Sequence, residues 1–170
     1  MRRWKVLSNL VKRHGWKTGA EIGVWKGQTF FHLLDVCPSL ELLIGVDSWP
    51  TSEPHEKDQD LGLSTWYPPE MIKVFRDSVV EKAATYDKAI LHEMDSVAAA
   101  DLVEDSTLDF VFIDADHSTE GVLRDIEAWR PKLKENGTLL GHDEQWPSVQ
   151  RALKSLFDEW TVHGDNVWSV

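Results

Sequence analysis

The sequence has one cysteine among its 170 residues, no long apolar run and few basic residues beyond its first twenty. Cys37 has no partner for an internal disulfide and lies on the apolar side of an expected helix, so we predict a buried thiol in a reducing compartment. No segment approaches the length of a membrane span, and the N-terminus lacks the apolar run of a signal peptide. These absences predict a soluble, cytoplasmic protein with no membrane partner.

Charge is unevenly distributed along the chain. Residues 1–20 hold six of the 18 basic residues and none of the 29 acidic ones, which leaves the remainder with a net charge of −17. A surface this acidic repels phosphate backbones, so we expect a small-molecule substrate rather than nucleic acid. The length fits one domain, residues 1–170, with a sizeable core.

Strand-like runs alternate with helical patterns from residue 19 onward, which predicts an α/β fold with a doubly wound, mostly parallel sheet and helices on both faces. Strands are expected at 19–24, 41–47, 88–94, 108–114 and 137–142. Helices are expected at 2–14 (within the N-terminal segment 1–17), at 28–37, from Ser118 to Pro131, and from Pro147 to Trp160. The tail 161–170 has the pattern of a closing antiparallel hairpin.

A glycine-punctuated turn follows the first expected strand, in the segment GAEIGVWKG of residues 19–27. Backbone N–H groups and the positive end of the next helix converge there, which suits a carboxylate-bearing ligand. Asp47 ends the second strand, where a carboxylate can accept both hydroxyl protons of a ribose. The G-x-G-x-x-G fingerprint of dinucleotide sites is absent, and Glu21 would repel a pyrophosphate. Glu21 beside Gly23 and Gly27 instead suits a ligand with an amino group and a sulfonium.

Polar residues also follow the next three expected strands. Asp95 and Ser96 fall where an adenine ring would lie, and they are equally good N-caps for a helix over 97–102. The two strands after them deliver acids and imidazoles to the same sheet edge, a cluster that packing alone does not explain. Its members are Asp114, Asp116, His117, His142, Asp143 and Glu144.

These ordered motifs carry a family resemblance. The pattern E-I-G-x-x-x-G with a later V-D resembles the first two motifs of class I S-adenosylmethionine-dependent methyltransferases. The segments FIDADHSTEGVLRDIEAW (112–129) and GTLLGHD (137–143) resemble small bacterial methyltransferases related to sugar and antibiotic O-methyltransferases, such as the macrocin O-methyltransferase group. The resemblance implies a Rossmann-like fold, S-adenosyl-L-methionine as cofactor, and methylation of a hydroxyl on a sugar or natural product.

The resemblance also implies residue roles at the cofactor. Glu21, Gly23 and Gly27 would shape the methionine pocket, with Glu21 nearest the amino group. Asp47 would hold the ribose, and Asp95 and Ser96 the adenine. Asp114 would also bind the cofactor, on a strand tip that faces the acceptor.

At the acceptor end, metal-dependent relatives hold Mg²⁺ through acidic residues on two strand tips. This arrangement carries over to Asp114, His142 and Asp143, with His142 where those relatives have an acid. Because imidazole suits Mn²⁺, Fe²⁺ or Zn²⁺ better than Mg²⁺, the identity of any metal stays open. With no metal, His117 or His142 would take the acceptor's proton as general base. We therefore predict His117, His142 and Asp143 as catalytic residues.

The segment 48–70 lacks periodicity and mixes proline, charge and tryptophan. A loop this long in a compact domain is typical of a lid or of disorder. Trp49 and Trp66 flank or occupy it, where they would line an acceptor pocket, stack on adenine, or only pack. A small domain with an exposed tryptophan-rich loop is also a candidate homodimer.

Two other classes of function remain open from the residues alone. A metal-dependent hydrolase could use Asp114, Asp116, His117, His142 and Asp143, but it would leave the glycine turn and Asp47 without a role. A non-catalytic cofactor-binding module is favoured if so short a chain cannot build an acceptor pocket.

Overall fold

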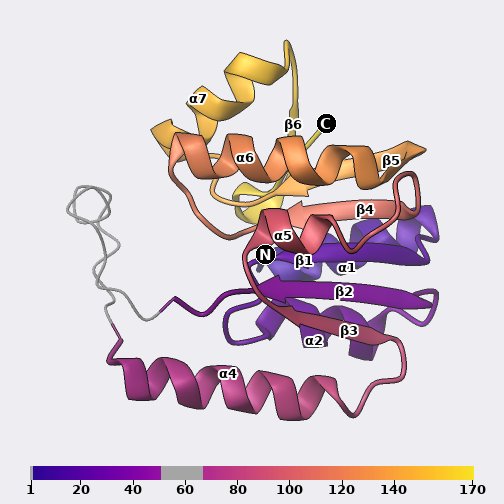
Figure 1. The fold of residues 1–170 in the computed structure, drawn as a ribbon. Helices are drawn as coiled ribbons and strands as arrows, with labels where there is room; N and C mark the ends of the chain where they lie inside the picture. The colour runs from indigo at the N-terminus through magenta and orange to yellow at the C-terminus, as the bar shows by residue number, and fades with distance from the viewer. Residues whose placement is uncertain (1, 51–66) are drawn as a thin grey trace.

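The structure, a computed structural model, describes residues 2–50 and 67–170. In that part the strands form one seven-stranded sheet in the order β3-β2-β1-β4-β5-β7-β6 (Figure 1). The strands are β1 Thr18–Ile22, β2 Leu42–Asp47, β3 Ala89–Glu93, β4 Leu108–Ile113, β5 Leu133–Gly141, β6 Thr161–Val162 and β7 Trp168–Ser169. Strands β1 to β5 pair in parallel, whereas β7 is antiparallel to both β5 and β6. The predicted mostly parallel sheet with a C-terminal antiparallel hairpin is confirmed.

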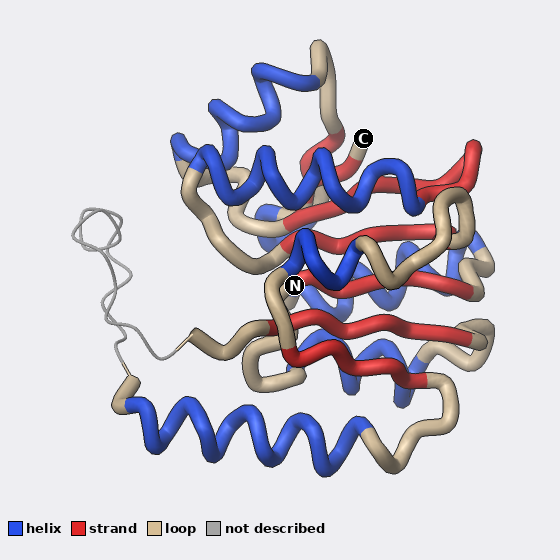
Figure 2. The backbone as a smooth tube through the Cα atoms, in the orientation of Figure 1, coloured by secondary structure: helices blue, strands red, loops and turns tan. Residues whose placement is uncertain are grey.

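Helices cover both faces of this sheet, as Figures 1 and 2 show. They are α1 Arg3–His14, α2 Gln28–Val36, α4 Pro69–Ala83, α5 Ser96–Ala100, α6 Thr119–Trp129 and α7 Pro147–Leu156, with 3₁₀ turns at Arg130–Lys132 and Gly164–Asn166. Buried side chains of α1, α2 and α4 share one apolar cluster, and those of α5, α6 and α7 share a second. None of the helices in the described ranges is long and apolar enough to cross a membrane.

The central strands divide their side chains between these two clusters. In β4, Phe110 and Phe112 join the first cluster, while Val111 and Ile113 join the second. This alternation explains why the strand reads as a continuous apolar run, since a parallel strand with helices on both sides is buried on both faces. Cys37 is fully buried in the first cluster, as predicted.

Local signals set the bounds of helix α6. The Ser118 hydroxyl accepts a hydrogen bond of 3.0 Å from the Gly121 N–H and caps its start. Val122, Ile126 and Trp129 then recur at helical spacing and are buried. The loop before α6, which carries Asp114, Asp116 and His117, is thereby held at the end of β4.

The C-terminal hairpin packs closely on β5. A Cβ atom at Gly141 would lie 2.1 Å from the ring of Trp168, so this position has room only for glycine. The Trp168 Nε1–H also donates to the His142 carbonyl at 3.1 Å. The hairpin therefore fixes the backbone at the carboxyl end of β5.

Three parts of the fold differ from the sequence prediction by more than two residues. Strand β5 begins at Leu133, not 137, because the pairing with β4 shifts between Leu108 and Phe110, so Asn136 and Gly137 lie inside the strand. Helix α7 ends at Leu156, and Trp160 lies beyond it, where its Nε1–H donates to Glu144 at 3.1 Å. Most of the predicted loop 48–70 lies outside the described residues, and its last two residues begin helix α4, which the sequence did not predict.

Candidate cofactor and active site

A cavity of about 640 Å³ lies at the carboxyl ends of strands β1 to β5. Its lining includes eight of the ten residues predicted for the site. These are Gly23, Asp47, Asp95, Ser96, Asp114, His117, His142 and Asp143. The other two predicted residues, Glu21 and Gly27, are not among its lining residues. The sheet edge thus brings together residues that are up to 120 positions apart in the chain.

Gly23 forms the first turn of the cavity wall. Its φ is +95°, and a Cβ atom there would lie 2.2 Å from the carbonyl oxygen of Asp114. The Gly23 N–H donates to the Val46 carbonyl at 2.8 Å, which ties the turn to the end of β2. Only glycine combines this backbone conformation with so close an approach to β4. Gly27, with a φ of +73°, precedes α2 and contacts the core instead of the cavity.

Asp47 joins the two loops that border the cavity. Its Oδ2 accepts from the Trp25 N–H and its Oδ1 from the Trp49 N–H, each at 2.7 Å. Burial raises the pKa of Asp47, and the backbone donors at Trp49 and Trp25 oppose that rise. Each carboxylate oxygen can accept a further hydrogen bond, so the residue remains able to receive hydroxyl protons.

Of the two tryptophans predicted to line a pocket or to pack, only Trp49 lies among the described residues. Trp49 is 3% exposed and packs in the cluster of α1 and α2, with its Nε1–H donated to the Trp25 carbonyl at 2.9 Å. It is a packing residue and does not line the cavity. Trp66 lies outside the described residues.

Glu21 lies inside the sheet, beside Gly45 of β2 and Phe112 of β4, and is 1% exposed. Burial raises the pKa of Glu21 well above its usual range; Asp114 and Asp47 add to the rise, and Arg3 opposes it. Its Oε2 has no hydrogen-bond partner among the described residues. Burial thus disfavours the charged form of Glu21, which lies behind the cavity wall.

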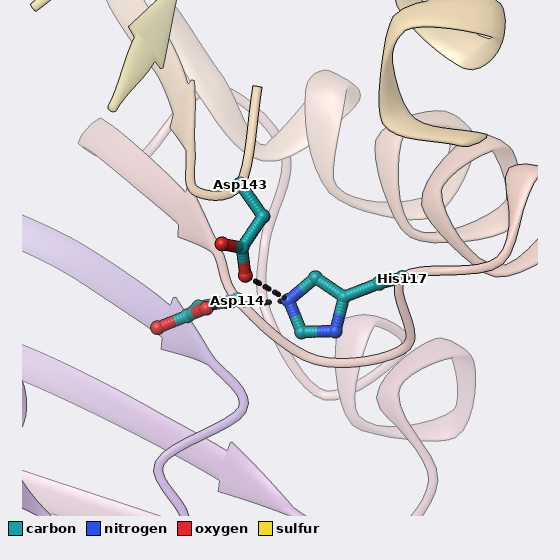
Figure 3. A group of neighbouring side chains, drawn as sticks. All are labelled: Asp114, His117 and Asp143. Atoms are coloured by element: carbon teal, nitrogen blue, oxygen red, sulfur yellow. Dashed lines mark ion pairs between the residues drawn. The ribbon is translucent and has the colours of Figure 1, made fainter. Parts of the chain in front are cut away.

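Two carboxylates and two imidazoles converge at the ends of β4 and β5. His117 Nε2 is 2.8 Å from Asp143 Oδ2 and 3.5 Å from Asp114 Oδ1 (Figure 3). His142 Nδ1 is 3.1 Å from Asp143 Oδ2 and 3.4 Å from Asp114 Oδ1. Asp143 adopts a φ of +55°, a left-handed conformation that costs free energy and is typical of functional sites.

Interactions within the cluster favour the charged forms of all four groups. Burial alone would lower the pKa of His117 and His142, but hydrogen bonds and charges from Asp114 and Asp143 raise both to about 9. Burial likewise opposes ionisation of the acids, yet the two histidines lower the pKa of Asp114 and Asp143. Both imidazoles therefore carry protons near neutral pH, so neither is a free base until it loses one.

The same donor set fits a divalent metal. One ligand atom from each of Asp114, His117 and Asp143 lies within 4.8 Å of the others, and these side chains point toward one another in Figure 3. His142 approaches the same two carboxylates, so the predicted ligands Asp114, His142 and Asp143 share this space with His117. Mixed imidazole and carboxylate donors suit Mn²⁺, Fe²⁺ or Zn²⁺ better than Mg²⁺.

Asp116 and Asp95 serve the local fold. Asp116 accepts from the N–H and the hydroxyl of Ser118, at 2.8 and 3.0 Å, and so shapes the loop after β4. Asp95 caps helix α5 by accepting from the Val97 N–H at 3.0 Å and the Ala98 N–H at 3.3 Å. Both residues also line the cavity, so these local roles leave contact with a ligand open.

The cavity wall also contains residues that were not among the predicted site residues, including Arg3, Arg124, Asp125 and Trp146. Arg3 reaches from α1, with its Nε 2.9 Å from Asp114 Oδ2, while its backbone N–H donates to Asp165. Trp146 packs its ring 4.5 Å from that of His117. No local pattern in the N-terminal helix marks Arg3, whereas the proximity of Trp146 to the His142-Asp143 pair was a usable signal.

Asp125 makes a testable contribution to stability. Burial raises its pKa to about 6, although a hydrogen bond from Ser96 opposes the rise. Because an unfolded aspartate ionises near pH 3.9, the unfolded state loses its proton first, and the stability that Asp125 contributes is lost between about pH 4 and pH 6. Asp125→Asn should therefore be more stable than wild type by up to about 3 kcal/mol at pH 7.5, and by much less at pH 4.5. Urea denaturation at both pH values measures this difference, and an equal difference at the two would contradict the assignment.

Comparisons with known proteins agree with this geometry. Residues 20–144 match the family model described as a methyltransferase domain. No curated protein matches the chain in a sequence comparison.

Solved structures share the fold at low sequence identity. An O-methyltransferase from Bacillus cereus, solved with S-adenosylhomocysteine, is 19% identical with a TM-score of 0.62, over 99% of this chain and 80% of that one. A methyltransferase from Podospora anserina, also with S-adenosylhomocysteine bound, is 14% identical with a TM-score of 0.68, over 98% and 76%. A spermidine synthase from Thermotoga maritima is 16% identical with a TM-score of 0.54, over 91% and 51%.

At these identities the structures show the fold alone, and the fold is shared by more than one kind of transferase. The family assignment comes instead from the family model, which covers most of the chain, including the glycine turn and both strand tips of the polar cluster. The chain belongs to the methyltransferase domain family, as a class I S-adenosylmethionine-dependent methyltransferase with a Rossmann-like fold.

Proposed function

We propose that the protein transfers the methyl group of S-adenosylmethionine to a hydroxyl of a small polar molecule, such as a sugar or a natural product. The observation that carries the proposal is the single cavity that joins the glycine turn, Asp47 and the Asp-His cluster at one sheet edge. The shared fold with an O-methyltransferase from Bacillus cereus supports transfer to oxygen. The cluster also suits a hydrolase, but membership of a methyltransferase family argues against that alternative.

The cofactor would lie along the tips of β1, β2 and β3. Its methionine end would meet the turn at Gly23, with its amino group on the side of Glu21. Its ribose hydroxyls would donate to Asp47, and its adenine would lie against Asp95 and Ser96. In this pose the sulfonium faces the cluster after β4 and β5.

The acceptor would enter beside the imidazoles and carboxylates. Direct displacement at a sulfonium methyl needs the attacking oxygen about 3 Å from the carbon and opposite the sulfur, so the protein's main tasks are to orient the acceptor and take its proton. His117, His142 and Asp143 would perform these tasks, with Trp146 as an apolar wall behind His117.

Asp114, His117 and Asp143, with His142 beside them, would hold a divalent metal if one is used. A bound ion supplies a Lewis acid that lowers the pKa of a hydroxyl in contact with it. The carboxylates raise the pKa of both imidazoles to about 9, so a histidine must lose its proton before it can act as a base. Metal binding would displace that proton, because a coordinating imidazole is neutral.

Isothermal titration tests the proposal. S-adenosylmethionine and S-adenosylhomocysteine are titrated into chelator-treated protein, and the titrations are repeated with Mg²⁺ and with Mn²⁺. We expect micromolar binding of both ligands, and an effect of Mn²⁺ that is lost in Asp143→Ala while cofactor binding is kept. No binding by folded protein under any condition would refute the methyltransferase site. Binding without release of S-adenosylhomocysteine on a panel of hydroxyl acceptors would favour a non-catalytic module.

A further inference from the structure

Lys26, in the glycine turn, has its side chain among aromatic rings. Its Nζ lies 4.1 Å from the ring centre of Phe75, 4.3 Å from that of Tyr67 and 6.0 Å from that of Trp25. It also donates a hydrogen bond of 3.0 Å to the Tyr67 hydroxyl. Within the described part of the chain it forms no ion pair with a carboxylate. Attraction to these three rings, which we call the aromatic cage, therefore takes the place of an ion pair for this cation.

The aromatic cage joins two segments that are far apart in the chain. The ring centres of Tyr67 and Phe75 are 5.2 Å apart, and that of Trp25 is 5.7 Å from each. Trp25 belongs to the glycine turn, whereas Tyr67 lies just before α4 and Phe75 lies within it. In residues 69–76, the first two turns of α4, only Ile72 is buried. The aromatic cage therefore fastens the start of α4 to the glycine turn.

Of the cage residues, Trp25 lines the cofactor cavity. Its φ is +50°, a left-handed conformation that is unfavourable for a bulky side chain and persists only where surrounding contacts hold it. In this conformation its N–H donates to Asp47 Oδ2 at 2.7 Å, and its carbonyl accepts from the Trp49 Nε1–H at 2.9 Å. The packing of its ring with Tyr67 and Phe75 therefore supports the hydrogen bond that orients Asp47.

We propose that Lys26 is a positioning residue for the cofactor. Its ammonium group holds the aromatic cage together, the cage keeps Trp25 in its left-handed conformation, and the Trp25 N–H keeps Asp47 oriented at the cavity. Lys26 is not among the lining residues of the cavity, so it acts without touching the ligand. The inference rests on the proposed ribose site at Asp47. Lys26 was not among the residues predicted from the sequence, although Gly23 and Gly27 of the same turn were.

The test measures the affinity for S-adenosylhomocysteine by isothermal titration in Lys26→Met, which keeps a long side chain but removes its charge. We expect binding about tenfold weaker than that of wild type. Lys26→Arg, whose guanidinium also binds aromatic faces, should stay within about threefold of wild type. Lys82→Met is the matched control, because Lys82 Nζ lies 4.2 Å from the ring centre of Phe31 and makes the same kind of contact between α4 and α2. It should bind the ligand as wild type does.

A second background shows whether Lys26 acts through Asp47. In Asp47→Ala the Trp25 N–H has lost its acceptor, so the addition of Lys26→Met should weaken binding by no more than about threefold further. A full additional tenfold loss would show that Lys26 acts by another route and would overturn the inference. Wild-type affinity in folded Lys26→Met would overturn it as well.

Urea denaturation of the two methionine variants controls for a general loss of structure, because each variant removes one cation of α4 or of its contacts and should lose a similar, small amount of stability. Equal losses of affinity in both would assign the effect to stability and overturn the inference. If Lys26→Met does not fold, Phe75→Leu takes its place, and undiminished affinity there has the same meaning. If wild type does not bind S-adenosylhomocysteine, the proposed function fails, a result distinct from binding that Lys26→Met leaves unchanged.

Discussion

Replacing Asp47 with alanine is expected to weaken the binding of S-adenosylmethionine and S-adenosylhomocysteine by about 100-fold or more. The change removes the carboxylate proposed to accept two ribose hydroxyls, and a hydrogen bond to a charged group contributes about 1.5–3 kcal/mol. It also frees the Trp25 and Trp49 N–H groups, whose 2.7 Å hydrogen bonds to Asp47 hold the two loops at the cavity. Isothermal titration with either ligand measures the loss.

Asp158→Ala is the matched control, because it removes an exposed carboxylate in the loop after α7. It should bind both ligands as wild type does. Asp47→Asn, which keeps the shape of the side chain but not its charge, should bind with intermediate affinity. Near wild-type affinity in folded Asp47→Ala would show that the ribose does not lie at the tip of β2.

Gly23→Ala is expected to destabilise the fold by more than about 3 kcal/mol. The new Cβ would lie 2.2 Å from the Asp114 carbonyl oxygen, on a residue whose φ is +95°. The strand end at β4 would have to shift, and with it the backbone that carries Asp114. Urea denaturation followed by circular dichroism gives the loss in the free energy of unfolding.

Gly15→Ala separates the two causes of that loss, which are the steric clash of the new Cβ atom and the conformational penalty at a positive φ. Gly15 has a φ of +65°, but nothing lies within 4 Å of its expected Cβ position. Its replacement should therefore cost only the conformational penalty, about 1–2 kcal/mol. If both alanine variants lose the same stability, the close approach of Gly23 to β4 is not what requires glycine there.

The sheet and its polar edge could be predicted because each depends on neighbouring residues in the chain. The run Phe110 to Ile113 is apolar throughout since the strand is buried on both faces, and the acids and imidazoles follow directly where such strands end. The parallel arrangement then forces the tips of β4 and β5 together. That is why Asp114 and Asp143 could be placed in one cluster without a structure.

The features that the sequence did not predict depend on weak local patterns or on contacts between residues far apart in the chain. Helix α4 buries only Ile72, Val79 and Ala83, so its apolar stripe is too thin to be recognised beside a proline-rich segment. The early start of β5 depends on a shift in its pairing with β4. Arg3 is 111 positions from Asp114, and nothing around it in sequence indicates that the two form an ion pair.

The packing of Trp168 against Gly141 has a consequence for the timing of folding. Strand β5 and the His142 carbonyl make contacts with β7, which follows every other strand of the sheet in the chain. Arg3 is likewise anchored through its backbone to Asp165. A nascent chain on the ribosome can form the β1 to β4 units as they emerge, but it cannot complete the cavity wall at the end of β5 until residue 168 has left the exit tunnel.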